Sequence, residues 1–244
     1  MTDMKNKIDE LQKYIDESKK IVFFGGAGVS TESGIPDFRS ETGLYSQKFD
    51  YPAELILSHS FFLQKTEYFF NFYRSKCLLL EAKPNKAHFK LAELEKAGKL
   101  LAVVTQNIDG LHQKAGSQKV YELHGSVHRN YCMECGKNYD PYTIVDCEGI
   151  PRCECGGIIK PDVVLFEEGL DDETIRGSLE AISRADLMIV AGTSLNVYPA
   201  AGMLDYFRGK KLVLINKTAT PFDSKADLVI NDKVGEVLSQ IVVK

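Results

Sequence analysis

Residues 21–40 read IVFFGGAGVSTESGIPDFRS and join a buried apolar run to a glycine-rich turn. The first six have the length and composition of a fully buried strand that runs into glycine. In the turn Gly26-Ala27-Gly28, backbone N–H groups can approach a pyrophosphate beside a helix N-terminus. A glycine-rich turn after a strand is often only a tight turn, so this motif alone leaves both interpretations open.

The turn departs from the dehydrogenase form of the motif. That form requires a third small residue at the position of Thr31 and an acidic residue about 20 positions further on, and neither is evident here. Residues 35–39 instead form a proline-rigidified loop, IPDFR, with an aromatic ring, a carboxylate and a guanidinium. Such a loop could close over a bound cofactor.

Strand-length apolar runs and helical patterns alternate along the rest of the chain. Apolar runs occur at residues 100–106, 163–166, 187–192 and 211–216. Helical spacing of apolar residues occurs at 8–15, 87–94, 175–182 and 234–242. This alternation predicts an α/β fold with a Rossmann-like parallel sheet covered on both faces.

Two segments interrupt this alternation. Residues 41–76 are rich in aromatic residues and are predicted to be helical, and residues 128–161 contain five of the six cysteines. We expect these segments to form a smaller domain that packs on the sheet. The sheet domain is then discontinuous and consists of residues 1–40, 77–127 and 162–244.

Polar residues follow several of the predicted strands. TQNIDGLH occupies residues 105–112, Thr193 and Ser194 follow the strand at 187–192, and Asn216 follows the strand at 211–216. Ligands bind at the carboxyl ends of the strands in such sheets, and these amides and carboxylate suit ribose hydroxyls and a carboxamide. Each residue alone could be a helix cap. Their convergence on one edge predicts a binding site.

His124 lies between this polar cluster and the cysteine-rich segment. A lone histidine is more often structural, and no carboxylate stands at a telling distance from it in the sequence. Its position nevertheless favours a function, because an imidazole at the edge of the sheet can act as a general base near neutral pH.

The cysteines are spaced as metal ligands. Cys132-x-x-Cys135 and Cys153-x-Cys155 resemble a four-thiolate zinc ribbon, whose closed site would be structural. The second pair is one residue shorter than usual, so Cys147 remains an alternative ligand, and unliganded thiols are the other alternative. Cys77 is predicted to be a buried apolar thiol.

Composition limits the partners. The net charge is −4, no stretch approaches the roughly 18 apolar residues of a membrane span, and the N-terminal MTDMKNKIDE is charged. These features predict a cytoplasmic protein without a membrane segment and without nucleic acid as a direct partner.

Seven motifs in register resemble the sirtuins, a family of NAD-dependent protein deacylases. They are GAGVSTESGIPDFRS, TQNIDGLH, LHGS, the paired cysteines, KPDVVLFEE, GTSLNVYPA and the late Asn216. The resemblance implies a Rossmann-like domain, a smaller domain of zinc ribbon and helical module, and a substrate tunnel between them. It also implies a reaction without hydride transfer, in which the acyl oxygen of an acyl-lysine attacks C1′ of the nicotinamide ribose. Nicotinamide leaves, and the products are O-acyl-ADP-ribose and free lysine.

The resemblance also assigns roles to individual residues. His124 would be the general base that activates a ribose hydroxyl, and Asn107 would hold the ribose and an ordered water. Ile108 and Asp109 would seat the carboxamide of nicotinamide, and Phe38 would shield C1′. Val164, Leu165 and Phe166 would pair with the substrate peptide backbone. The rest of the NAD site would be lined by Ala27, Thr31, Arg39, Gln106, Thr193, Ser194, Asn216 and Lys233.

The chain departs from the family pattern at two places beside the site. Glu167 stands where the family usually has the glycine of F-G-E, and Gly25 stands where threonine is common. Members that prefer succinyl-lysine or malonyl-lysine carry Tyr-x-x-Arg in the helical module. This chain offers Tyr73-x-x-Lys76 or, by ungapped counting, Phe72 and Ser75, so we expect deacetylation of lysine in proteins or peptides. The alternatives are mono-ADP-ribosyl transfer, a preference for longer or acidic acyl groups, and a non-catalytic NAD-binding or zinc-ribbon scaffold.

Overall fold

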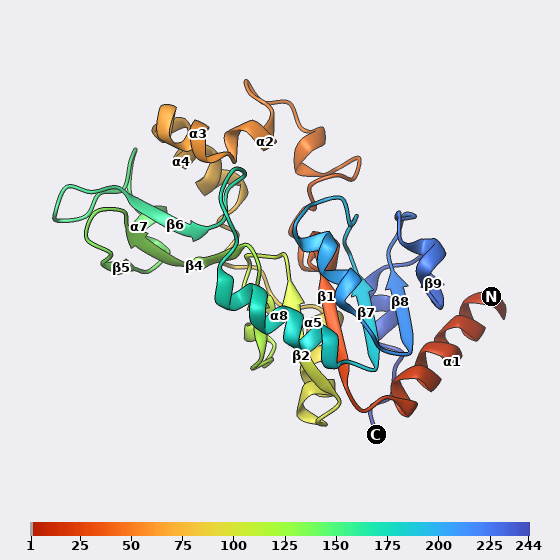
Figure 1. Ribbon diagram of the computed structural model, residues 1–244. Helices are drawn as coiled ribbons and strands as arrows, with labels where there is room; N and C mark the ends of the chain where they lie inside the picture. The colour runs from red at the N-terminus through yellow and green to blue at the C-terminus, as the bar shows by residue number, and fades with distance from the viewer. Residues whose placement is uncertain (1) are drawn as a thin grey trace.

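The computed structural model describes residues 2–244 and has a parallel sheet at its centre (Figure 1). Six strands lie in the order β3-β2-β1-β7-β8-β9, and every neighbouring pair is parallel. The strands are β1 (Ile21–Gly25), β2 (Leu100–Thr105), β3 (Val120–Glu122), β7 (Leu187–Ala191), β8 (Lys211–Ile215) and β9 (Leu228–Ile230). The predicted α/β class with a Rossmann-like parallel sheet is confirmed.

Successive residues of the central strands are buried on opposite faces of this sheet. In β1, Phe23 belongs to the core on one face and Phe24 to the core on the other, and both are fully buried. Side chains alternate between the two faces of a strand, so a strand covered on both faces must be apolar throughout. This requirement explains the uninterrupted apolar runs of β1 and β7.

Helices cover both faces. The core that contains Phe23 includes side chains of α1 (Thr2–Glu17), α5 (Lys86–Lys96) and α9 (Val234–Leu238). The core that contains Phe24 includes side chains of α8 (Asp172–Arg184) and the 3-10 helix η4 (Ala200–Tyr206). Shorter pieces near the strand ends are η1 (Ala27–Val29), η2 (Thr31–Ser33), α6 (Leu111–Lys114) and η5 (Asp223–Lys225).

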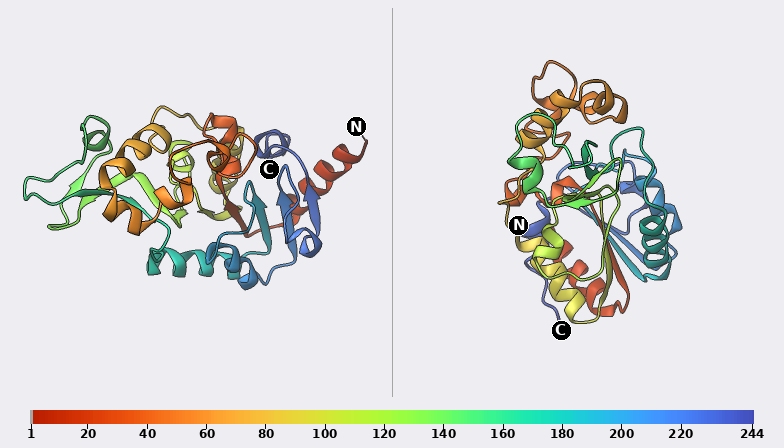
Figure 2. Two further views of the ribbon diagram at one scale, coloured as in Figure 1. Left: turned by 90° about the horizontal axis from the view of Figure 1, so that it is seen from above. Right: turned by 90° about the vertical axis from the view of Figure 1, so that its left-hand side faces the viewer.

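The remaining elements form a smaller lobe at one end of the molecule, and α1 lies toward the other end (Figure 2). The lobe contains an antiparallel sheet with the order β5-β4-β6. Its strands are β4 (Gly125–Cys132), β5 (Asn138–Tyr139) and β6 (Ile159–Val163). Its helices are η3 (Leu44–Ser46), α2 (Ala53–Ile56), α3 (His59–Gln64), α4 (Thr66–Lys76) and α7 (Tyr142–Val145).

Aromatic rings fill the interior of the lobe. Phe62, Phe69 and Phe70 are fully buried, and their ring centroids are 5.0–6.0 Å apart. Val127 of β4 and Val163 of β6 belong to the same core. The helical segment and the cysteine-bearing segment therefore pack against each other.

The apolar run at residues 163–166 is not a strand of the parallel sheet, as its place in the alternation had suggested. Val163 ends β6 in the small antiparallel sheet, and Phe166 makes only an isolated bridge with Ser58. Val163 and Leu165 are buried in the aromatic core of the lobe. An apolar run shows that a segment is buried but not which sheet buries it.

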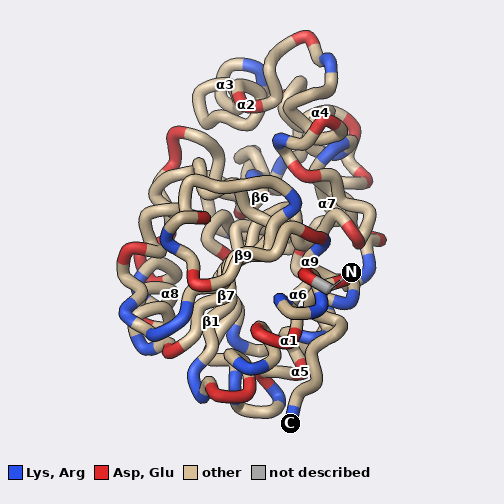
Figure 3. The backbone as a smooth tube through the Cα atoms, turned by 90° about the vertical axis from the view of Figure 1, so that its right-hand side faces the viewer, with Lys and Arg blue, Asp and Glu red and all other residues tan. Residues whose placement is uncertain are grey.

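Two further properties concern the molecule's surroundings. Figure 3 shows Lys and Arg residues interspersed with Asp and Glu residues along the backbone. Among the described helices, none is long and apolar enough to cross a membrane.

Candidate functional site

The strand order of the parallel sheet reverses at β1. The chain proceeds from β1 to β2 and β3 on one side, whereas β7, β8 and β9 lie on the other. In open α/β sheets the ligand site lies outside the carboxyl ends of the strands at such a point. The residues that the sequence assigned to NAD lie mainly in the loops at this edge.

Glycines let two of these loops come into contact. The N–H of Gly28 donates to the carbonyl oxygen of Gly192 at 2.8 Å, and the N–H of Gly26 donates to Ala191 at 3.2 Å. A Cβ on Gly28 would lie 2.7 Å from the Cα of Gly192, which is too close for a side chain. These two N–H groups are therefore used in loop packing. The approach of the turn to a pyrophosphate stays a prediction.

The loops after β1 and β2 are joined by the buried Ser30 and Asn107 and the partly buried Asp109. The Oγ of Ser30 donates to Asp109 at 2.6 Å and accepts from the Nδ2 of Asn107 at 3.0 Å. The other carboxylate oxygen of Asp109 accepts from the N–H of Leu111 at 2.9 Å. Asn107 and Asp109 are thus held together in one hydrogen-bonded group. Ser30, which is almost fully buried, completes this group but was not singled out from the sequence.

A second group connects the loops after β2, β7 and β8. The Nε2 of Gln106 donates to the Oγ1 of Thr193 at 3.0 Å. The side-chain amide of Asn216 bonds the backbone of Thr193 twice, at 2.9 and 3.0 Å. The two groups bring together five of the residues predicted at the edge of the sheet: Gln106, Asn107, Asp109, Thr193 and Asn216.

His124 lies in the turn between β3 and β4. Its Nδ1 is 2.9 Å from the carbonyl oxygen of Gln106. A carbonyl oxygen only accepts, so Nδ1 carries the proton and Nε2 keeps its lone pair. Burial lowers the pKa of His124, against the opposing effect of the bond to Gln106. The imidazole is therefore neutral near pH 7 and has a free basic nitrogen.

The loop that carries Phe38 and Arg39 is ordered by its own residues. The Oδ1 of Asp37 accepts from the N–H groups of Arg39 and Ser40 at 3.0 and 2.8 Å. The ring of Tyr45 lies 5.5 Å from the ring of Phe38 and 5.4 Å from the guanidinium of Arg39. Asp37 thus shapes the loop that carries the two side chains assigned to the cofactor.

The other residues assigned to NAD lie around these groups. Ala27, Thr31 and Ser194 are partly exposed, and Thr31 donates to the carbonyl oxygen of Gly28. Ile108 packs against the aromatic core of the lobe. Lys233 is exposed and precedes α9, whose Gly235 N–H donates to Glu32 at 2.7 Å.

Asn85 was not identified as part of the site from the sequence. Its Nδ2 donates to the carbonyl oxygen of Val29 at 2.8 Å and to the Oγ of Ser33 at 3.0 Å, so it supports the loop after β1. The same residue caps helix α5. The available signal was an Asn directly before a helical pattern, and that signal indicates a cap but not a second bond to a distant loop.

The residues assigned to the substrate peptide have most of their backbone groups in use. Val164 donates to the carbonyl oxygen of His124, Leu165 donates to Glu168, and Phe166 donates to Leu57. Leu165 is buried, whereas 40% of Phe166 is exposed. The segment is therefore held firmly beside His124.

Four cysteine sulfurs gather in the lobe. The Sγ atoms of Cys132, Cys135, Cys153 and Cys155 all lie within 4.8 Å of one another. The Cys132–Cys155 and Cys135–Cys153 separations are 3.4 and 3.6 Å, close to the roughly 3.8 Å between thiolates around a tetrahedral zinc ion and too long for a disulfide. The donor set fits a structural Zn²⁺. Cys147 lies outside it, and its Sγ donates to the carbonyl oxygen of Glu148.

Comparison with known proteins agrees with this arrangement. The model of the Sir2 family matches residues 26–199, which include the first loop group, Gln106 and Thr193 of the second, His124 and the four cysteines. The chain belongs to the Sir2 family.

Sir2 relatives match the chain over nearly its full length. The NAD-dependent protein deacetylase of Clostridium acetobutylicum is 63% identical, and the match covers 97% of this chain and 98% of the relative. That of Clostridium perfringens is 60% identical, with 98% and 100% covered. This Sir2 chain is accordingly an NAD-dependent protein deacetylase, and the predicted sirtuin resemblance, enzyme class and NAD co-substrate are confirmed.

Two solved Sir2 structures are also similar to the chain. In a Sir2 complex with a p53 peptide and NAD⁺, the Sir2 chain is 42% identical to this chain, with a TM-score of 0.86. The match covers 96% of each chain. A Sir2 variant with a deacetylated p53 peptide and 3′-O-acetyl-ADP-ribose is 41% identical, has a TM-score of 0.89 and is covered over 95% of both chains.

Proposed function

We propose that this Sir2 enzyme deacetylates lysine side chains of proteins or peptides, with His124 as the general base. The observation that carries the proposal is the imidazole of His124, kept neutral by burial and fixed by the carbonyl oxygen of Gln106. His124 lies at the carboxyl edge of the sheet, where the two hydrogen-bonded sets of side chains described above converge. The similar Sir2 structures with peptide, NAD⁺ and an acetyl-ADP-ribose product support the same reaction.

NAD supplies a ribose carbon, C1′, which loses nicotinamide and is captured by the acetyl oxygen of the substrate. The protein's part is to bind, orient and move a proton. The Nε2 of His124 accepts a proton from a ribose hydroxyl, which then attacks the acetyl carbon. One water molecule is consumed as the amine of lysine is released, and the acetyl group ends on a ribose hydroxyl of ADP-ribose.

Asn107 and Asp109 would position the nicotinamide ribose and its carboxamide. Both are preset by Ser30, so their side chains need little rearrangement when the co-substrate binds. Gln106, Thr193 and Asn216 form the neighbouring wall, and Phe38 and Arg39 lie on the loop that would cover the site. Because these side chains are already ordered in the folded protein, little conformational entropy is lost when the co-substrate binds. This preorganisation favours the reacting geometry.

The substrate peptide would lie beside residues 164–166. This segment follows a strand, donates through Val164 to the backbone of His124, and leaves Phe166 partly exposed. A peptide that approached here would bring its acetyl-lysine next to the general base. Since most backbone groups of the segment are already bonded, main-chain pairing would involve only a few of its groups.

Acetyl is the acyl group that best fits the helical module. Tyr73 is fully buried and stacks on Phe69, so it does not reach an acyl chain. Lys76 donates to Gln47 at 3.1 Å and lies 5.5 Å from the ring of Phe49. Neither residue presents the hydroxyl and cation that an acidic acyl group would need.

Product analysis tests the proposal and its main alternative. Incubation with NAD and an acetyl-lysine peptide should give nicotinamide, deacetylated peptide and O-acetyl-ADP-ribose in equal amounts by mass spectrometry. Transfer of ADP-ribose to a protein, with no acetylated nucleotide in solution, would instead establish mono-ADP-ribosyl transfer. Faster removal of succinyl than of acetyl from matched peptides would overturn the acyl preference.

The domain limits are part of the same proposal. Residues 1–40, 77–127 and 162–244 would form the NAD-binding domain, and residues 41–76 and 128–161 the small domain. The substrate would enter between them.

A further inference from the structure

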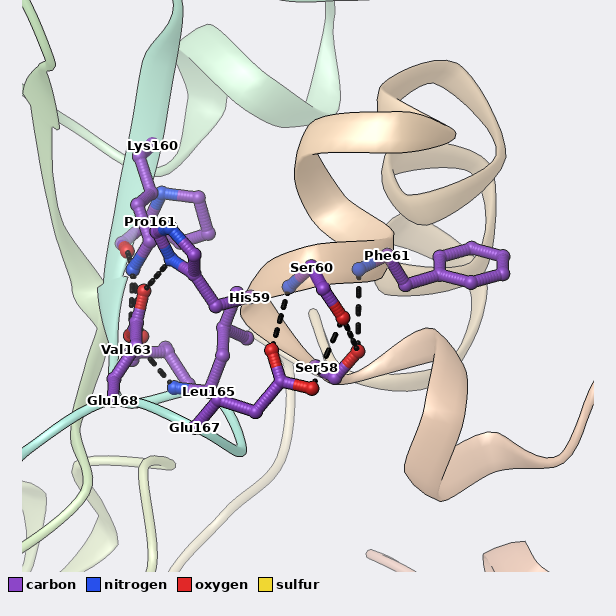
Figure 4. Close-up of polar contacts among 10 residues, drawn as sticks. All are labelled: Ser58, His59, Ser60, Phe61, Lys160, Pro161, Val163, Leu165, Glu167 and Glu168. Carbon is purple, nitrogen blue, oxygen red and sulfur yellow. Dashed lines mark hydrogen bonds and ion pairs between the residues drawn. The ribbon is translucent and has the colours of Figure 1, made fainter.

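The segment after β6 is tied to the helical module by a set of polar contacts, here called the clasp (Figure 4). The clasp consists of Glu167, Glu168, His59, Ser60 and Lys160. The Oε1 of Glu168 lies 2.8 Å from the Nδ1 of His59, and its Oε2 accepts from the N–H of Leu165 at 2.8 Å and from Lys160 at 3.1 Å. Lys160 is almost fully buried. One carboxylate therefore joins the small sheet, the substrate segment and the helical module.

Glu167 makes the other half of the clasp. Its φ is 77°, in the left-handed region where glycine is favoured. Its carboxylate accepts from the N–H of Ser60 at 2.9 Å and from the Oγ of Ser60 at 3.0 Å. A glycine would suit the backbone better but could make neither bond. A disfavoured conformation that persists beside a binding segment points to a functional gain.

Main-chain bonds continue this connection. Phe166 donates to the carbonyl oxygen of Leu57 at 3.0 Å, and the N–H of His59 donates to the carbonyl oxygen of Phe166 at 3.0 Å. The bonds from Ser60 to Glu167 come directly after these two along both segments. Residues 166 and 167 are thus bonded to residues 57–60 at consecutive positions.

We propose that Glu167 is a positioning residue that holds residues 164–166 in the conformation that receives the substrate peptide. The inference rests on the proposed function, which assigns this segment to the peptide. Without the bonds to Ser60 the segment gains freedom, and peptide binding must then restrict that freedom. Within the described part of the chain, the side-chain hydrogen bonds of Glu167 go to Ser60 and not to a residue assigned to NAD, so we expect the effect to be specific to the peptide.

Three substitutions test this role. In E167G the backbone is relaxed and both bonds to Ser60 are lost. The KM for the peptide should therefore rise about threefold to tenfold, the effect expected for hydrogen bonds to a charged acceptor. The kcat and the KM for NAD should change by less than about twofold. In S60A one bond remains, and the KM should rise by a smaller factor. E167Q keeps an acceptor of the same length and should restore most of the affinity.

E167Q also separates positioning from charge. If Glu167 acted only by attracting basic residues of the peptide, E167Q and E167G would raise the KM equally, and the proposal would be overturned. A KM in E167G equal to that of the unchanged enzyme would overturn it as well. An unchanged or higher melting temperature of E167G, together with a raised KM, supports positioning over a general structural role.

Hydrogen exchange keeps this test independent of the proposed function. In E167G, the amides of His59, Ser60 and Phe166 should exchange faster, whereas those of β7 should be unaffected. Unchanged exchange at these three amides contradicts the clasp, whatever the activity. Faster exchange in an enzyme that fails to release nicotinamide with any acetylated peptide would instead refute the proposed function.

Discussion

His124 depends on its surroundings in two ways. The carbonyl oxygen of Gln106 fixes the tautomer, and burial keeps the ring neutral. Replacement of His124 by Tyr should therefore lower turnover by at least about a hundredfold, the contribution typical of a general base. NAD affinity measured by calorimetry should remain within a few fold, because most of the contacts proposed for NAD belong to other residues. Unchanged turnover would remove His124 from its role.

The pH profile follows from the same residue. Because burial lowers the pKa of His124 below its ordinary 6.5, the basic form persists into mildly acidic solution. The acidic limb of kcat/KM should therefore have its midpoint below pH 6.5, with activity falling as pH decreases through it. Measurement of kcat/KM from pH 4.5 to 8 checks this, and a midpoint above 6.5 would contradict it.

At the scale of single residues, the sequence identified the polar side chains at the sheet edge but not the bonds that hold them. Asn107, Asp109 and Thr193 were found because amides, carboxylates and hydroxyls after strands suit a nucleotide. Ser30 and Asn85 were missed because each acts on a loop distant in sequence. The roles assigned to the individual site residues remain predictions.

Among the elements, helix α5 links stability to the site. Asn85 accepts from the N–H of Ala87 at 2.9 Å, donates from its own N–H to His88, and also bonds the loop after β1. Asn85→Ala should lower the free energy of unfolding by about 1–2 kcal/mol, the effect of a lost cap, and should weaken NAD binding as well. Lys96→Ala on the exposed part of the same helix is the control for denaturant titration and calorimetry. Equal effects of the two substitutions would contradict the dual role.

The strands of the parallel sheet were predictable to the extent that they were long. β1, β2, β7 and β8 contain five or six residues, whereas β3 and β9 contain three each and were not predicted. A three-residue strand carries too little periodicity to be distinguished from a loop. The segment at 163–166 was placed wrongly because its apolar residues serve the aromatic core of the lobe.

For the molecule as a whole, the zinc site determines the integrity of the lobe's outer end. Among the described residues, the buried cluster there consists of Cys132, Cys153 and Ile159 with the partly buried Tyr139 packed against it, so apolar burial contributes little. Removal of zinc by a chelator, or Cys132→Ala, should unfold the β4–β6 sheet and abolish most activity. Circular dichroism and zinc release measure this, and Cys147→Ala should retain the metal. Full zinc content in Cys132→Ala would refute the assignment.

We expect stability in acid to depend on two buried histidines. His88 of α5 and His112 of α6 are fully buried, with ring centroids 4.7 Å apart. Burial lowers the pKa of His88 to about 4 from 6.5, and burial lowers the pKa of His112 well below its usual value. Both histidines bind protons more readily in the unfolded chain, so their contribution to stability is complete above pH 6.5 and declines as the pH falls toward 4.

Replacement of His88 by Gln tests this dependence. Gln cannot take up the proton but can still accept the N–H of Asn85, as in an ordinary capping box. Denaturant titrations between pH 7 and 4.5 give the free energy of unfolding at each pH. This free energy should fall less steeply with decreasing pH in the variant, by the contribution of up to about one proton taken up on unfolding. An equal pH slope in both proteins would show that His88 does not titrate on unfolding.

The order of the elements has one further consequence. The chain leaves the parallel sheet after η2 and returns at α5, then leaves again after β3 and returns at α8. Four connecting segments of the backbone thus join the lobe to the parallel sheet, in two outward and return pairs. A protease that cuts any single crossing would leave the remaining tethers intact, so the nicked protein should migrate as two fragments only after denaturation.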